Sequence, residues 1–157
     1  YKRQLHQLCA DMIGRKVERI EGSGGFGADS KSYPLPDANG KIGKLISVNI
    51  DKMKINWTHE QEAMFLTSSL STAGGLTFIG DLDRYFKAFN SKTGEVLWKT
   101  RLGSALHGLP ITYSVGKKQY VAITSGMGVF RALTATISPD IYQPENGNAI
   151  YVFELEE

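Results

Sequence analysis

Cysteine is almost absent from this sequence of 157 residues, because Cys9 stands alone. One cysteine excludes an internal disulfide framework and any zinc site built from cysteines. The motifs C-x-x-C-H, H-E-x-x-H and G-x-S-x-G are also missing, which argues against an attached haem, a zinc protease and a serine hydrolase. The chain therefore lacks the short motifs that most directly indicate a catalytic centre.

Long hydrophobic runs and an excess of one charge are absent too. No apolar stretch approaches the roughly 20 residues of a membrane-spanning helix. The formal net charge is +2 with both signs interspersed, which gives no electrostatic reason to expect nucleic acid or a membrane surface as partner. The first residues, YKRQLHQLCADM, have no signal-peptide pattern, and we expect a mature chain or a piece of a longer one.

Glycine, by contrast, is abundant. Of the seventeen glycines, eight lie in three clusters: GSGGFG at 22–27, GG at 74–75 and GMG at 126–128. Between them lie short runs in which apolar and polar residues alternate, the pattern of half-buried strands. This combination predicts an all-β fold with many turns. The expected strands are 44–50, 54–57, 76–81, 85–90, 95–102, 109–115, 118–126 and 149–156.

Three stretches fall outside this pattern. The segment 5–20 has helical spacing but could equally be a strand followed by a loop. The segment 21–41 is loop by composition, and 127–148, which contains two prolines, is expected to be a second long irregular stretch.

An internal repeat organises the strands. A shift of 41 residues places Trp57 on Trp98 and Asn49 on Asn90, and a shift of 44 places 76–80 on 120–124. A period of about 40–50 residues with about four strands per unit is typical of β-propeller blades. The chain holds roughly two to three such units and is too short for a complete propeller of four to eight blades.

The clearest unit contains AFNSKTGEVLW, a strand, a turn and a second strand. Gly94 is expected to take a positive φ, and Asn90 to tie the turn through its side chain. We expect Trp98 to pack between neighbouring blades, with its indole N–H donating to a carbonyl. Trp57 is also expected to have a structural role, in a degraded copy of the motif where Met53 replaces the turn glycine.

This motif, together with STAGGL, GDLDRYFKAF, GLPITY, KQYVAITSG and the terminal NGNAIYVFEL, resembles the closing blades of the pyrroloquinoline quinone (PQQ) dependent alcohol dehydrogenases. Those enzymes, of the methanol and ethanol dehydrogenase type, are eight-bladed propellers built from antiparallel four-stranded blades. The resemblance divides the chain into an irregular lead-in with a blade fragment (1–42), two blade repeats with tryptophan-docking motifs (43–126), a long loop (127–148) and a closing strand (149–157).

The resemblance also implies a cofactor side. Phe78, Gly128, Val129 and Phe130 fall where the family lines its PQQ site, although Phe78 could equally be a plain core aromatic, and Val129 and Phe130 replace the family's residues. No residue of this chain matches the family's catalytic aspartate or its metal ligands, so no catalytic or metal-binding residue is assigned.

Three polar residues that could suggest chemistry are read as structural. His107 is expected to be a loop histidine without catalytic duty. Asp81 and Asp83 are expected to be turn residues, because Ca²⁺ takes about six to eight oxygen ligands.

The parent implied by the resemblance oxidises alcohols in the periplasm by hydride transfer to PQQ, with Ca²⁺ or a lanthanide as metal and a cytochrome or quinone as electron acceptor. Expressed alone, the chain is expected to be inactive and to bind neither cofactor tightly. Its partners would be the rest of the propeller chain and further copies of itself, joined through open blade edges. Two alternatives stay open: a non-enzymatic propeller-repeat module for binding or assembly, and a stand-alone lectin-like β domain.

Overall fold

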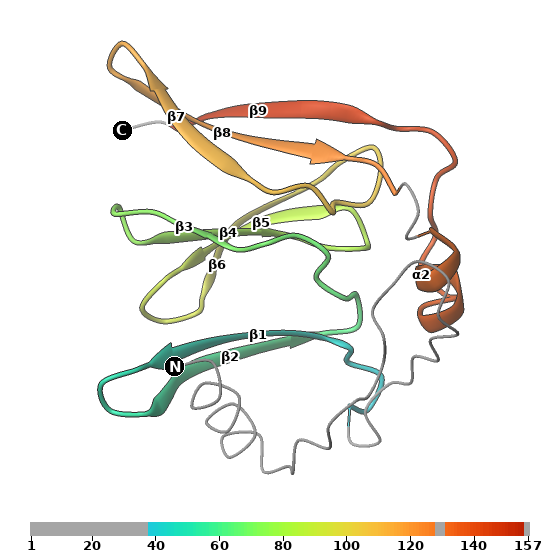
Figure 1. The fold of residues 1–157 in the computed structure, drawn as a ribbon, viewed down its shortest axis with the longest axis horizontal. Helices are drawn as coiled ribbons and strands as arrows, with labels where there is room; N and C mark the ends of the chain where they lie inside the picture. Colours follow the sequence, from blue (N-terminus) through green and yellow to red (C-terminus); the bar gives the residue numbers. More distant parts are fainter. Residues whose placement is uncertain (1–37, 128–130, 156–157) are drawn as a thin grey trace, which may run out of the picture.

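The computed structural model describes residues 38–127 and 131–155, and in them the chain forms antiparallel sheets (Figure 1). The first sheet pairs β1 (Gly43–Asn49) with β2 (Lys54–Gln61). The second has the order β3 (Leu70–Ser71), β4 (Leu76–Gly80), β5 (Tyr85–Asn90), β6 (Val96–Arg101). The third has the order β7 (Ile111–Val115), β8 (Lys118–Ser125), β9 (Ala149–Leu155). The prediction of an all-β antiparallel fold is confirmed.

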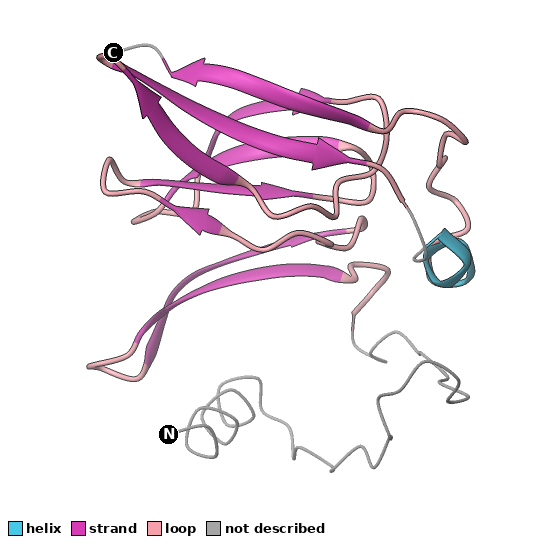
Figure 2. Cartoon of the chain, turned by 45° about the horizontal axis from the view of Figure 1, so that its top comes forward, coloured by secondary structure: helices cyan, strands magenta, loops and turns pink. Residues whose placement is uncertain are grey.

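The sheets are layered in chain order, with the second between the first and the third (Figures 1 and 2). The β1–β2, β3–β4, β5–β6 and β7–β8 turns lie toward the left of Figure 1, whereas the β4–β5 turn and the links from one sheet to the next lie toward the right. Each pair of antiparallel strands thus returns the chain to the same end, where the next sheet begins.

The inner strands β4 and β5 of the second sheet are buried on both faces, which explains why they are so apolar. Phe86 and Ala88 of β5 belong to the core shared with Val121 and Ile123 of the third sheet. Phe89, on the opposite face of β5, is fully buried and meets the ring of Trp57 from the first sheet. Alternate residues of β5 therefore contact two different neighbouring sheets.

The repeat deduced from the sequence is visible in the pairing of the strands. In β1–β2 the register shifts between Ser47 and Val48, and in β5–β6 it shifts between Ala88 and Phe89, which is 41 residues later in each case. An irregularity kept at the same position in two hairpins is a feature of the unit rather than an accident of one strand.

The expectation of an irregular stretch over 127–148 was wrong in part, because the helix α2 covers Arg131–Ile137. The two prolines that indicated a loop, Pro139 and Pro144, lie beyond its end, where a proline cannot disturb the helix. Its last turn is closed by a hydrogen bond of 2.8 Å from the amide of Ser138 to the carbonyl of Thr134.

The two-residue strand β3 was not expected, and β2 runs four residues further than the predicted 54–57. The predictions for segment 5–20 and for most of the lead-in lie outside the described residues. Within the described ranges, no helix has the length and apolar character needed to span a membrane.

Candidate functional site

Trp57 joins the first sheet to the second. Its indole N–H donates a hydrogen bond of 3.0 Å to the carbonyl of Ser91, in the β5–β6 turn. Its ring lies nearly parallel to that of Phe89, with 6.2 Å between centroids and 8° between planes. The kind of hydrogen bond that the sequence predicts for Trp98 is thus found at Trp57, the corresponding tryptophan of the preceding hairpin.

Gly94 makes the close approach of Trp57 possible. A Cβ added to Gly94 would lie 2.5 Å from Cδ2 of Trp57, closer than real Cβ contacts allow. The φ of Gly94 is 75°, which confirms the expected left-handed conformation. Asn90 fixes the same turn, since its side-chain oxygen accepts the amide N–H groups of Lys92 at 2.9 Å and Thr93 at 3.3 Å.

Trp98 lies between the second and third sheets, as expected, but more openly. Its ring meets Phe153 of β9 edge-on, with 5.2 Å between centroids, and Phe86 at 6.2 Å. Even so, 40% of Trp98 is exposed. Both tryptophans therefore pack between sheets, and these contacts give them a structural role.

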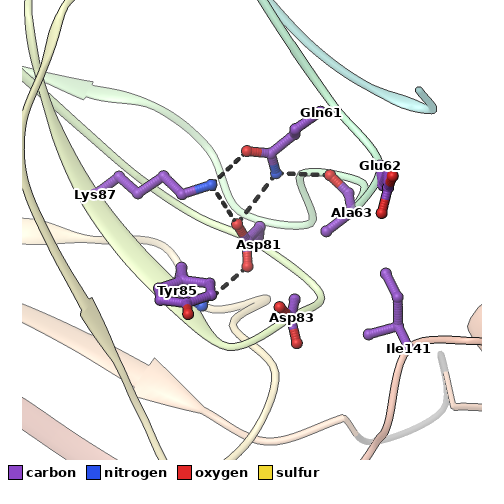
Figure 3. Close-up of a pocket in the computed structure, with 8 residues that line it drawn as sticks. All are labelled: Gln61, Glu62, Ala63, Asp81, Asp83, Tyr85, Lys87 and Ile141. Carbon is purple, nitrogen blue, oxygen red and sulfur yellow. Dashed lines mark hydrogen bonds and ion pairs between the residues drawn. The ribbon is translucent and has the colours of Figure 1, made fainter.

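A buried polar cluster lies at the other end of the first two sheets, where the chain passes between them (Figure 3). Asp81, directly after β4, is 1% exposed. It forms an ion pair with Lys87 of β5, with 2.7 Å between Oδ2 of Asp81 and Nζ of Lys87. Gln61, at the end of β2, bridges the pair: its amide nitrogen donates to Asp81 at 3.1 Å, and its oxygen accepts from Lys87. The amide of Tyr85 donates to Asp81 at 2.9 Å, so the carboxylate is well satisfied.

This cluster borders a pocket of about 240 Å³. Side chains and loops from both sheets and from the segment after α2 line it: Gln61, Glu62, Ala63, Asp81, Asp83, Tyr85, Lys87 and Ile141 (Figure 3). Nζ of Lys87 donates to a carboxylate oxygen of Asp81 and to the side-chain oxygen of Gln61, so these contacts hold it within the cluster. The cluster connects the sheets and presents mixed charge to the pocket.

His59 lies between this cluster and the docking joint. Its ring meets Phe89 edge-on, with 4.9 Å between centroids, and its Nε2 is 3.3 Å from the oxygen of Gln61. Burial lowers the pKa of His59 and outweighs the opposite effect of the bond to Gln61, while the charge of Lys87 lowers this pKa further. The joint therefore favours neutral imidazole.

Sequence reasoning did not find the pairing of Lys87 with Asp81. Asp81 was correctly expected in a turn, but it is also the buried anion of the cluster. The sequence signal for this pair was Lys87 itself. It shares with Tyr85 and Phe89 the face of β5 that meets the first sheet. A lysine at such a position needs a buried partner.

The predicted cofactor-side residues are only partly within the described chain. Phe78, in β4, is 3% exposed, and its ring stacks on Phe86 with 5.8 Å between centroids. Its surroundings are thus those of a core aromatic, and contact with a cofactor stays a prediction. Gly128, Val129 and Phe130 lie outside the described residues.

The other candidates for chemistry do not converge. His107 lies in the link between β6 and β7, and Asp83 is ion-paired with Arg101. Within residues 38–127 and 131–155, no three histidine, cysteine, aspartate or glutamate side chains come together to hold a metal ion. The described residues therefore do not fit a metal centre of the kind that the resemblance implies for the parent enzyme.

Layered antiparallel sheets of this kind, with a tryptophan packed between each sheet and the next, define a blade-repeat protein. The sequence matches the family described as "PQQ: Glucose/ethanol/alcohol dehydrogenase, beta-propeller domain" over residues 38–121, more than half of the chain. The chain belongs to this family.

Individual relatives agree with this assignment. The chain is 35% identical over 146 residues to a quinoprotein ethanol dehydrogenase of Pseudomonas aeruginosa, covering 92% of this chain and 23% of that protein. It is 33% identical over 123 residues to a lanthanide-dependent methanol dehydrogenase of Methylorubrum extorquens, covering 78% of this chain and 20% of that protein.

Among solved structures, a europium-containing methanol dehydrogenase matches with a TM-score of 0.60 and 34% identity, over 71% of this chain and 23% of the other. A quinohemoprotein alcohol dehydrogenase from Comamonas testosteroni matches with the same TM-score of 0.60 and 28% identity. The chain spans about a fifth of the length of the curated relatives.

Proposed function

We propose that this chain forms closing blades of a PQQ-dependent dehydrogenase that oxidises alcohols in the periplasm. The observation that carries the proposal is the similarity to a quinoprotein ethanol dehydrogenase over 92% of this chain. The inter-sheet joint of Trp57 and Gly94 supports it, because stacked blades need such joints to build a propeller.

In this proposal the chain supplies a wall of the cofactor pocket and no catalytic or metal-binding residue. Phe78 and the segment 128–130 are the residues assigned to that wall. The bound PQQ would accept the hydride, and Ca²⁺ or a lanthanide would act as Lewis acid. A cytochrome or a quinone would take the electrons onward. The lanthanide is included because one relative is a lanthanide-dependent methanol dehydrogenase.

The partner of this chain is the rest of the propeller polypeptide, which would cover the outer faces of the first and third sheets. Exposed apolar side chains on the third sheet support this assignment, among them Ile111, Ile150 and Val152. Without that partner, unpaired edges would promote association of the chain with itself.

A dye-linked assay tests the proposal at two lengths. The complete protein that contains this sequence, loaded with PQQ and either Ca²⁺ or La³⁺, is expected to oxidise methanol or ethanol. The 157-residue chain under the same conditions is expected to show no turnover. A complete protein that binds no PQQ and oxidises neither alcohol would contradict the enzyme assignment and favour a non-enzymatic assembly module.

A further inference from the structure

The turn between β4 and β5 holds the backbone of Arg84 firmly and leaves its side chain without a polar partner. The amide of Arg84 donates to the carbonyl of Asp81 at 3.3 Å, and its carbonyl accepts the amide of Leu102 at 2.8 Å. In the part of the chain that the structure describes, Nε of Arg84 is buried without a hydrogen-bond partner and the guanidinium forms no ion pair. A permanent positive charge thus stands beside the pocket without a counter-ion.

The backbone of Arg84 is also strained. Its φ is 72°, in the left-handed region where residues other than glycine are uncommon and asparagine and aspartate are the usual exceptions. Glycine would adopt this conformation without strain. Strain of this kind persists where the surrounding contacts enforce it, and it gathers at sites that hold ligands. An arginine at a place where the backbone favours glycine points to a use for its side chain.

One face of this guanidinium lies against Tyr142, in the segment 138–143 that follows α2. Cζ of Arg84 is 5.7 Å from the centroid of the tyrosine ring, and 70% of Tyr142 is exposed. A guanidinium that stacks on an aromatic ring keeps its N–H groups in its own plane, where they match a planar oxyanion in pairs. Tyr142 therefore acts as a platform that orients the arginine for an anion.

The segment 138–143 brings two more buried donors without partners. Ser138 is 7% exposed, and its Oγ has no hydrogen-bond partner among the described residues, nor has Nε2 of Gln143. The side-chain oxygen of Gln143 is 3.1 Å from the hydroxyl of Thr134, which leaves the amide nitrogen as the free end. With Arg84, three buried groups can donate, and unpaired buried donors favour a ligand that is rich in acceptors.

The pocket described above gives a small molecule access to this place. Asp83 and Ile141 line it, and they are the chain neighbours of Arg84 and Tyr142 (Figure 3). The turn and the segment after α2 therefore meet at the same cavity, whose volume of about 240 Å³ suits a small organic molecule.

The charges around the pocket are compatible with an anion at Arg84. Asp83 is ion-paired with Arg101, and Asp81 is ion-paired with Lys87, so both carboxylates are neutralised by cations of their own. The other carboxylates of the pocket lining and of the segment are exposed to water, which screens their repulsion of an anion: Glu62 and Asp140.

We propose that this pocket binds a small molecule through a carboxylate or phosphate group. Arg84 is the anion-binding residue, Tyr142 is its platform, and the segment 138–143 supplies further donors. The paired N–H groups of an arginine fit either kind of anion. The proposal involves neither PQQ nor a metal nor the remaining blades, so its test can fail separately from the activity assay.

Isothermal titration calorimetry of the 157-residue chain tests the proposal, with acetate, succinate and inorganic phosphate as probes at constant ionic strength. We expect saturable binding of at least one probe at a single site and no binding of chloride. At ten times its dissociation constant, that probe should raise the melting temperature by about 3 °C. Tighter binding of acetate or succinate identifies a carboxylate ligand, and tighter binding of phosphate identifies a phosphate ester.

The variant Arg84→Gly separates the use of the side chain from its conformational cost. Without probe it should melt at a higher temperature than the original chain, because the strain is relieved, and it should no longer bind the anion. The matched control is Met53→Gly, at the other strained turn with a φ of 51°. This control should also melt at a higher temperature but bind the anion normally.

Two further variants test the surroundings of the arginine. Tyr142→Leu removes the platform, and Gln143→Glu replaces a donor by a carboxylate of the same shape. Each should weaken binding about tenfold while circular dichroism shows an unchanged fold.

Four results would overturn the proposal. None of the oxyanions binds, chloride binds as tightly as they do, Arg84→Gly binds as tightly as the original chain, or Gln143→Glu leaves binding unchanged.

Discussion

The hairpins β1–β2 and β5–β6 have the same pattern of turn residues and differ in what packs against their turns. Both place an asparagine before the turn, a positive φ four residues later (51° at Met53, 75° at Gly94) and a tryptophan after it. Trp57 lies against Gly94, whereas Met53 is 50% exposed. Within the described residues, no sheet precedes the first one.

The difference shows that glycine can be needed in this turn for two separate reasons, its backbone conformation and the space beside it. A left-handed backbone costs a side chain about 1–2 kcal/mol, and Met53 accepts this cost. At Gly94 the contact with a docking tryptophan leaves no room for any side chain, so this position requires glycine for the second reason as well. Glycine is thus required where a neighbouring sheet docks and is dispensable where the turn faces solvent.

The largest change in the free energy of unfolding should come from replacing the tryptophans. The size of this change should differ between the joint of Trp57 and the joint of Trp98. Trp57→Ala is expected to lower the free energy of unfolding by about 3 kcal/mol, because it removes a stacked ring and a hydrogen bond. Trp98→Ala should cost about 1–2 kcal/mol, since 40% of Trp98 is already exposed. Urea denaturation followed by circular dichroism measures both. Equal losses would contradict the distinction between a closed joint and an open one.

The next largest changes in stability should come from substitutions at the two turn positions, and they should have opposite signs. Gly94→Ala should destabilise the chain by about 2 kcal/mol, through backbone strain and the clash with Trp57. Met53→Gly should stabilise it by about 0.5–1 kcal/mol, because strain is relieved while the unfolded chain gains some freedom. The same urea titrations apply, and a destabilising Met53→Gly would show that its φ is not strained.

The smallest effect should be the response of the first hairpin to pH. His59 lies at its joint, and the position 41 residues later is Thr100. Because the pKa of His59 is lowered from 6.5 in the folded state, the unfolded chain binds the proton more readily. The stabilisation is complete above pH 6.5 and declines as the pH falls through the lowered pKa.

The variant His59→Gln isolates this contribution. Between pH 7.5 and 5.5 the original chain should lose more stability than the variant, as measured by thermal unfolding at each pH. Parallel pH profiles for the two proteins would show that His59 does not titrate differently in the folded and unfolded states.

Much of this joint could be predicted from the sequence, because its determinants are local. Asn90, Gly94 and Trp98 lie within nine residues, and turn chemistry fixes their roles. The repeat then transferred those roles to Asn49, Met53 and Trp57.

What could not be predicted depends on contacts across the fold or on weak local signals. The ion pair of Asp81 with Lys87 needs Gln61 from another sheet to complete it. The seven-residue helix α2 was masked by the prolines that follow it. The strained backbone of Arg84 emerged only from the structure, since its φ is positive although the residue is neither glycine nor asparagine.

A double-mutant cycle between Trp57 and Gly94 tests the central claim, that the glycine is required because the tryptophan docks on it. Gly94→Ala should cost about 2 kcal/mol in the original chain but only about 1 kcal/mol, the cost of its backbone conformation, in the Trp57→Ala background. A coupling of about 1 kcal/mol is therefore predicted. Additivity of the two losses to within about 0.3 kcal/mol would contradict the account.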